Sequence, residues 1–200
     1  MNRSRIAAFA VALLWLSAPA AWADGHASVD GSPKILGDPD APVTIIEYAS
    51  LSCPHCALFH ADRMPWLKEN FIDTGRVKLE FRDFPLNAPA LWGAMLAHCA
   101  GPDSYFAYLD FLFKKQPQWA FTEEPQSALK AMAKQAGMSG GQFDACMKDE
   151  SLQNAIIESR RIGIEDDKVE ATPSFVIDGE TISGIPEEAD FTARIEAAGG

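Results

Sequence analysis

The chain has 200 residues, of which 28 are acidic and 17 are basic, so its formal net charge at pH 7 is −11. An acidic surface repels phosphate groups, which argues against binding to nucleic acid or to anionic lipid. With 48% hydrophobic residues, the sequence is long and apolar enough for one domain with a core of its own.

Residues 1–23 have the pattern of a secretory signal peptide. A basic start, MNRSR, precedes an apolar run from Ile6 to Leu16, and small residues follow at Ala21 and Ala23. This order predicts cleavage after Ala23 and export from the cytoplasm. A membrane anchor is the alternative, but an apolar run of about 11 residues is shorter than the roughly 20 that a spanning helix needs.

A strand–helix–strand unit is predicted next. Residues 24–36 are expected to form an N-terminal tail, because the segment is mostly polar and contains glycine. VTIIEY at residues 43–48 is β-branched and aromatic, which favours a buried strand. The stretch after it has helical spacing with a kink expected at Pro65, and VKLEFRDF at 77–84 alternates as a second strand.

The second half of the chain is mainly helical. Residues 88–164 predict four or five short helices separated by proline and glycine, and strand signals return in a hairpin around Gly179 before a last amphipathic helix. This order predicts an α/β fold in which one sheet carries a helical insertion. Residues 37–87 and 165–200 would then form one domain, and residues 88–164 the inserted helical domain.

Two cysteines directly follow the first strand, in the motif CPHC at residues 53–56. A zinc site usually takes two closely spaced ligand pairs, and neither Cys99 nor Cys146 has a second cysteine nearby. Haem attachment requires a histidine after the second cysteine, where this chain has Ala57. A structural disulfide that closes only four residues would constrain the unfolded chain little. No metal site is therefore expected.

The position of the motif favours a reactive thiol. Cys53 is expected at the start of a helix, where free backbone N–H groups and the helix dipole stabilise an anion. Pro54 fits the first helical turn, and the Cys56 N–H and a charged His55 would add to this stabilisation. Because the thiolate is the reactive species, Cys53 and Cys56 are predicted to be redox-active.

Glu47 lies in the middle of the apolar strand, and two interpretations are open. On an edge strand its carboxyl group would reach water. In a strand covered on both faces it would be buried at a cost in free energy, beneath the cysteine pair. The second interpretation predicts proton exchange between Glu47 and Cys56.

The segment GDPDAPVTIIEYASLSCPHC resembles the start of the DsbA family, the bacterial periplasmic thiol oxidases with a thioredoxin fold. Three features carry the resemblance: the CPHC motif, Glu47 six residues before Cys53, and Thr172-Pro173 before the late strand, which matches the cis-proline of this fold. The resemblance implies a thioredoxin-like fold whose helical domain is inserted between the second main strand and the C-terminal hairpin. Other members often have valine where this chain has Thr172, which leaves its oxidising strength open.

The resemblance also implies a function. The protein would be a periplasmic thiol:disulfide oxidoreductase that donates its Cys53–Cys56 disulfide to unfolded, newly exported proteins with free thiols. A DsbB-type membrane oxidase would reoxidise it, and no metal or dissociable cofactor would be needed. Two alternatives stay open: a disulfide isomerase or reductase kept reduced by a membrane partner, and a non-catalytic, chaperone-like thioredoxin-fold module.

Cys99 and Cys146 lie on apolar faces of predicted helices in the insertion. Buried free thiols fit such positions, but export to an oxidising compartment favours a structural disulfide. Some DsbA relatives look similar in having a second cysteine pair in this region. His60 and His98 are interpreted as ordinary histidines of a helix face or of the core.

Overall fold

The computed structural model describes residues 30–200, so the predicted signal peptide lies outside the described residues. A five-stranded sheet has the order β1-β3-β2-β4-β5. Strands β2 and β3 are parallel, and the other neighbouring pairs are antiparallel. The strands are β1 Lys34–Leu36, β2 Val43–Ala49, β3 Val77–Asp83, β4 Ser174–Ile177 and β5 Glu180–Ser183.

Strand β1 lies inside the predicted N-terminal tail, and this boundary differs from the expectation. Its three residues pair with β3, where Ile35 lies opposite Glu80. A strand of three residues is too short to show the alternation that identifies a strand in a sequence. The tail therefore ends before Lys34 in the structure.

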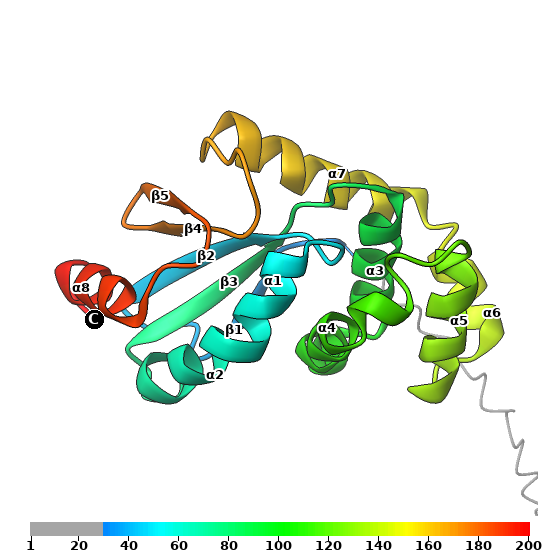
Figure 1. The fold of residues 1–200 in the computed structure, drawn as a ribbon, viewed down its shortest axis with the longest axis horizontal. Helices are drawn as coiled ribbons and strands as arrows, with labels where there is room; N and C mark the ends of the chain where they lie inside the picture. The colour runs from blue at the N-terminus through cyan, green and yellow to red at the C-terminus, as the bar shows by residue number, and fades with distance from the viewer. Residues whose placement is uncertain (1–29) are drawn as a thin grey trace, which may run out of the picture.

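One helical segment continues from Pro54, the second residue of the CPHC motif, to Ile72 (Figure 1). It consists of α1 Pro54–Leu58, the π-helical turn η1 Phe59–Arg63, α2 Met64–Leu67 and the π-helical turn η2 Lys68–Ile72. The N–H of Met64 bonds to the carbonyl of Phe59, five residues back, just before Pro65. The irregularity expected at Pro65 thus takes the form of a π-helical turn.

The helical insertion lies between β3 and the β4–β5 hairpin, as the sequence predicted. In Figure 1, α3 to α6 group at one end of the sheet, and α7 extends from that group back toward β4. The last helix, α8 Glu188–Ala197, lies at the other end of the sheet. The insertion consists of α3 Ala88–Cys99, η3 Pro102–Ser104, α4 Tyr105–Lys114, η4 Gln116–Gln118, α5 Pro125–Gln135, α6 Gly140–Cys146 and α7 Glu150–Glu165.

Two main apolar clusters stabilise this arrangement. One packs η1, α2, η2 and α8 against the sheet around Phe59 and Phe175. The other joins the sheet to the insertion around Trp119 and includes both Cys53 and Cys56. The cysteine pair therefore lies where the two parts of the fold meet.

A small residue allows α7 to approach the sheet closely. A Cβ atom on Gly163 would lie 2.7 Å from the ring of Tyr48 on β2, which is closer than carbon atoms can pack. Glycine at this position lets the helix cover the end of β2. Within residues 30–200, no helix is both long and apolar enough to cross a membrane.

Candidate active site

Hydrogen bonds from two parts of the chain hold the CPHC motif in place. Cys53 has an extended backbone and caps α1, and its N–H bonds to the carbonyl of Ser50 at 2.9 Å. The buried side chain of Gln116 donates hydrogen bonds to the carbonyls of Leu51 and Cys53, at 2.8 and 2.9 Å. An amide from the insertion thus fixes the loop that carries the thiols.

The two cysteines are free thiols in very different surroundings. A hydrogen bond with the Cys56 side chain, with further contributions from Thr172 and from backbone N–H groups of the first helical turn, lowers the pKa of Cys53 to about 5, although burial opposes this. Burial raises the pKa of Cys56, which is fully enclosed at 0% exposure. At neutral pH Cys53 is therefore mainly a thiolate and Cys56 a neutral thiol.

The loop before β4 closes one side of the site. The Thr172–Pro173 peptide bond is cis, and the carbonyl of Thr172 lies 3.3 Å from Cys53 Sγ. Cys53 and Thr172 are 119 residues apart in the sequence, and the pairing of β2 with β4 brings them together. Pro54 and His55 are exposed at the start of α1, next to the thiols.

Glu47 is buried, which excludes the edge-strand interpretation. Strand β2 lies between β3 and β4, and the side chain of Glu47 has 0% exposure. Its Oε1 lies 3.0 Å from Nε2 of His60, whereas Oε2 has no hydrogen-bond partner among the described residues. The charge of Glu47 contributes to the raised pKa of Cys56, so the two groups are close enough to interact.

His60 lies on the inner face of the helical segment, as the sequence interpretation allowed, and it is also paired with a carboxyl group. It follows Cys56 by four residues, a spacing that places both side chains on one face of the helix. Its ring pairs with Glu47 on β2 and stacks on Phe113 with ring centres 4.3 Å apart. The helical spacing was a usable signal, but the partner on β2 was not visible in the sequence.

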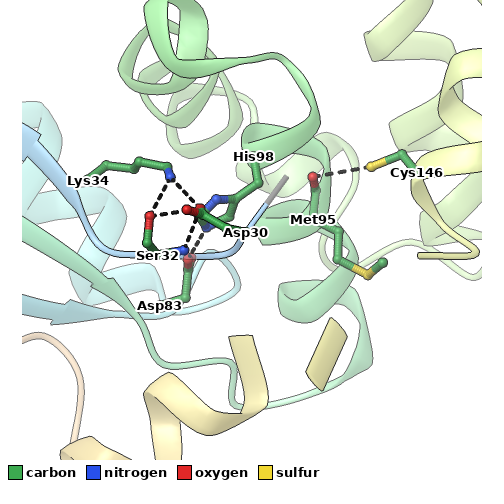
Figure 2. A network of polar contacts seen from close by, with 7 residues as sticks. All are labelled: Asp30, Ser32, Lys34, Asp83, Met95, His98 and Cys146. Atoms are coloured by element: carbon green, nitrogen blue, oxygen red, sulfur yellow. Dashed lines mark hydrogen bonds and ion pairs between the residues drawn. The ribbon is translucent and has the colours of Figure 1, made fainter. Parts of the chain in front are cut away.

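His98 is also paired, although at a different place. Its Nε2 lies 2.7 Å from Oδ2 of the buried Asp83 at the end of β3. Figure 2 shows this pair close to the start of the described chain, where Asp30, Ser32 and Lys34 bond to one another.

The structure contains a disulfide between Cys99 and Cys146, with a Cα–Cα distance of 6.1 Å. It joins the end of α3 to the end of α6 inside the insertion. Cys146 Sγ also lies 3.3 Å from the carbonyl oxygen of Met95 (Figure 2), a packing contact because a disulfide sulfur carries no hydrogen.

A groove of about 800 Å³ opens beside the thiols, between α1, α2 and α4. Its walls are mostly apolar, with His60 and a few charged side chains at intervals. It is lined by Pro54, Ala57, Leu58, His60, Ala61, Met64, Pro65, Lys68, Asp110, Phe113, Lys114, Gln116 and Pro117.

Known proteins share this arrangement. The family profile described as thioredoxin matches residues 30–197. The crystal structure of alpha-DsbA1 from Wolbachia pipientis is 33% identical, covers 83% of this chain and 90% of its own, and superimposes with a TM-score of 0.76. The chain belongs to the DsbA branch of the thioredoxin family. Its thioredoxin-like fold with a helical insertion is the one that the sequence predicted.

Curated relatives of this DsbA-family chain are named for disulfide chemistry. A putative protein-disulfide oxidoreductase of Rickettsia bellii is 28% identical over 152 residues, which are 76% of this chain and 59% of the relative. The chain thus spans less than two thirds of that relative's length. Disulfide bond formation protein D of Bacillus subtilis is 28% identical, with 86% of this chain and 82% of the relative covered.

Two further observations complete the site of this DsbA-family chain. Among residues 30–200, no group of three or more histidine, cysteine or acidic side chains is arranged to hold a metal ion. Gln116 was absent from the sequence-based site, because nothing in the sequence distinguishes a buried loop-binding amide from an exposed one.

Proposed function

We propose that the protein is a periplasmic thiol:disulfide oxidoreductase that donates the Cys53–Cys56 disulfide to newly exported proteins. The observation that carries this proposal is the geometry of the pair: Cys53 caps α1 beside the Thr172 carbonyl, with its pKa lowered to about 5, whereas Cys56 is fully enclosed. A thiol with a low pKa is a good leaving group and makes its disulfide a strong oxidant.

The reaction proceeds by two thiol–disulfide exchanges. A substrate thiolate attacks Cys53 Sγ, the more accessible sulfur at 6% residue exposure against 0% for Cys56. The Cys53–Cys56 bond breaks, a mixed disulfide forms on Cys53, and Cys56 leaves as a thiolate that takes up one proton. A second thiolate of the substrate then attacks the substrate sulfur of the mixed disulfide and displaces Cys53 as a thiolate. The substrate loses two electrons, and the cysteine pair gains them.

The neighbouring residues have distinct roles in this scheme. Pro54 begins the helix whose N–H groups stabilise the Cys53 thiolate. His55 follows it and presents an imidazole group beside the thiolate. Glu47 exchanges the proton with Cys56. Pro173 holds the Thr172 carbonyl against Cys53, where it can position a substrate backbone beside the sulfur.

The wider setting follows from the same proposal. The signal peptide at residues 1–23 would deliver the chain to the periplasm, and a DsbB-type membrane oxidase would restore the Cys53–Cys56 disulfide. Residues 34–87 and 165–200 would form the catalytic domain, residues 88–164 the inserted helical domain, and the Cys99–Cys146 bond would stabilise the insertion.

An oxidation assay and an isomerisation assay separate the proposed function from its alternatives. Oxidised protein is mixed with reduced, unfolded ribonuclease without glutathione, and substrate thiols are counted over time. Reduced protein is mixed separately with scrambled ribonuclease. We expect two substrate thiols to disappear per oxidised pair, with little recovery of the scrambled substrate.

The doubly substituted variant Cys53→Ser, Cys56→Ser is the control and should transfer nothing. Efficient recovery of scrambled ribonuclease with poor thiol oxidation would identify an isomerase instead. If neither assay responds to the wild-type protein, the chaperone-like alternative replaces the proposal.

A further inference from the structure

The burial of Glu47 limits how protons can reach Cys56. Both side chains have 0% exposure, and Glu47 lies in the middle of the central strand. In each catalytic cycle Cys56 must gain one proton when it leaves and lose one when the disulfide is restored. A closed site that exchanges protons needs a side chain that connects it to water.

His60 contacts Glu47 and also lines the groove. Its Nε2 lies 3.0 Å from Glu47 Oε1, and its Nδ1 lies 3.6 Å from Oδ1 of Asp110 on α4. The side chain of His60 is 4% exposed, whereas that of Asp110 is 70% exposed. His60 and Asp110 both line the groove beside the thiols. One imidazole ring therefore spans the distance between a sealed carboxyl group and a carboxylate in water.

Aromatic side chains keep this ring in one orientation. Phe113 stacks on it at an angle of 24°, and Phe59 and Phe81 meet it edge-on, with ring centres 5.4 and 6.1 Å away. Nδ1 of the ring faces Asp110 and is buried, without a hydrogen-bond partner among residues 30–200. The distance of 3.6 Å is too long for a hydrogen bond, but the exposed Asp110 side chain can rotate to shorten it.

We propose that Glu47, His60 and Asp110 form a proton relay between Cys56 and the water of the groove. The proposal rests on the proposed function, because it describes proton movement during thiol exchange. His60 acts through Glu47 and is a positioning residue, not a catalytic one.

The relay conserves charge at each step. When Cys56 loses its proton, the proton moves to the unpartnered Oε2 of Glu47, and the His60 imidazolium releases its Nδ1 proton toward Asp110 and water. A carboxylate–imidazolium pair thus becomes a carboxylic acid and a neutral imidazole. When Cys56 leaves as a thiolate, Glu47 returns its proton and His60 takes one from water. The buried pair has no net charge in either state, which avoids a large desolvation penalty.

The charges around the His60 ring favour the carboxylate–imidazolium pair over the neutral pair. Burial opposes a charge on His60, but the carboxylates of Glu47 and Asp110 outweigh it and raise the pKa of His60 to about 9. The imidazolium is therefore the main form at neutral pH. The ionisable groups near the pair or lining the adjoining groove are Glu47 on β2, Cys56 on α1, Lys68 on η2, and Tyr105, Asp110 and Lys114 on α4.

Resolution of a glutathione adduct on Cys53 by Cys56 tests the relay, because this step requires Cys56 to lose its proton. The adduct is formed and its decay is followed by stopped flow from pH 5 to pH 9. We expect His60→Ala to slow resolution about 10-fold at pH 7. Added imidazole should restore most of the rate, because the deleted ring lines an open groove. His60→Gln keeps a hydrogen-bond donor near Glu47 but cannot titrate, so it should be equally slow with a flatter pH profile.

Two controls separate a relay from a structural role. His98→Ala removes a histidine from a comparable buried pair with Asp83 and should resolve at the wild-type rate. The alkylation rate of Cys53 should be unchanged in both His60 variants. A wild-type rate and pH profile in His60→Gln, or slow resolution in His60→Ala that imidazole does not restore, would overturn the relay. If wild-type protein does not resolve the adduct, the proposed function itself fails.

Discussion

Cys56→Ser is expected to accumulate mixed disulfides with exported proteins, whereas Cys53→Ser is expected to accumulate none. Cys53 caps α1 beside the Thr172 carbonyl and has the lowered pKa. In Cys56→Ser its thiolate attacks a disulfide of an exported protein, forms a mixed disulfide and displaces the other substrate sulfur as a thiolate. Cys56 is fully enclosed, so its thiol is shielded from substrate. Without Cys56 the adduct on Cys53 has no internal thiol to resolve it, and turnover should stop.

The adducts can be measured directly. Each variant is expressed in a bacterial host with its leader, thiols are alkylated, and the periplasmic fraction is compared on gels with and without reductant. Mass spectrometry of the shifted species should place every substrate bond on Cys53. Adducts that form on Cys56 in Cys53→Ser, and not on Cys53 in Cys56→Ser, would reverse the assignment.

Replacing both Cys99 and Cys146 by alanine is expected to lower the free energy of unfolding by about 4 kcal/mol. The bond closes a loop with a sequence separation of 47, and the chain-entropy relation assigns about 4 kcal/mol to a loop of this length. The bond joins α3 to α6, and both helices belong to the helical insertion and not to the sheet. The loss should therefore appear in stability and not in the chemistry of the CPHC motif.

Urea unfolding of the double alanine variant and of wild-type protein, both with the Cys53–Cys56 pair reduced, gives the difference. Cys53→Ser with Cys56→Ser is the matched control: it also removes two cysteines, but it keeps the bond in the insertion. A loss below about 1 kcal/mol in the alanine variant would show that the bond does not stabilise the fold.

The helices and strands whose apolar residues recur at a regular period were predictable from the sequence. The strand 43–48, the strand 77–84, the helical insertion and the hairpin around Gly179 are all present in the structure. Strand β1 was not predicted, because three residues show no period. The Cys53 position at a helix start was also predictable, since a buried strand ends at Ala49, shortly before Pro54.

Contacts between different elements of the fold could not be predicted from the sequence. Glu47 could have been exposed or buried until the pairing of β2 with both β3 and β4 decided between them. Its partner His60 lies 13 residues away, and helical spacing alone places that ring beside Cys56 without naming Glu47. Gln116 reaches the CPHC loop only because the insertion folds back over it.

The equilibrium reduction potential of the Cys53–Cys56 pair tests the central claim most directly. Protein is equilibrated at pH 7 with graded glutathione buffers, and the thiols of the two residues are counted by mass after alkylation. The Cys53 pKa of about 5 lies between about 7 for thioredoxin and about 3.5 for DsbA, whose potentials are about −270 and about −120 mV. We predict a potential between about −200 and −120 mV, which would let the pair oxidise exported proteins. A potential at or below about −270 mV would mean that the pair works as a reductant and would contradict the account.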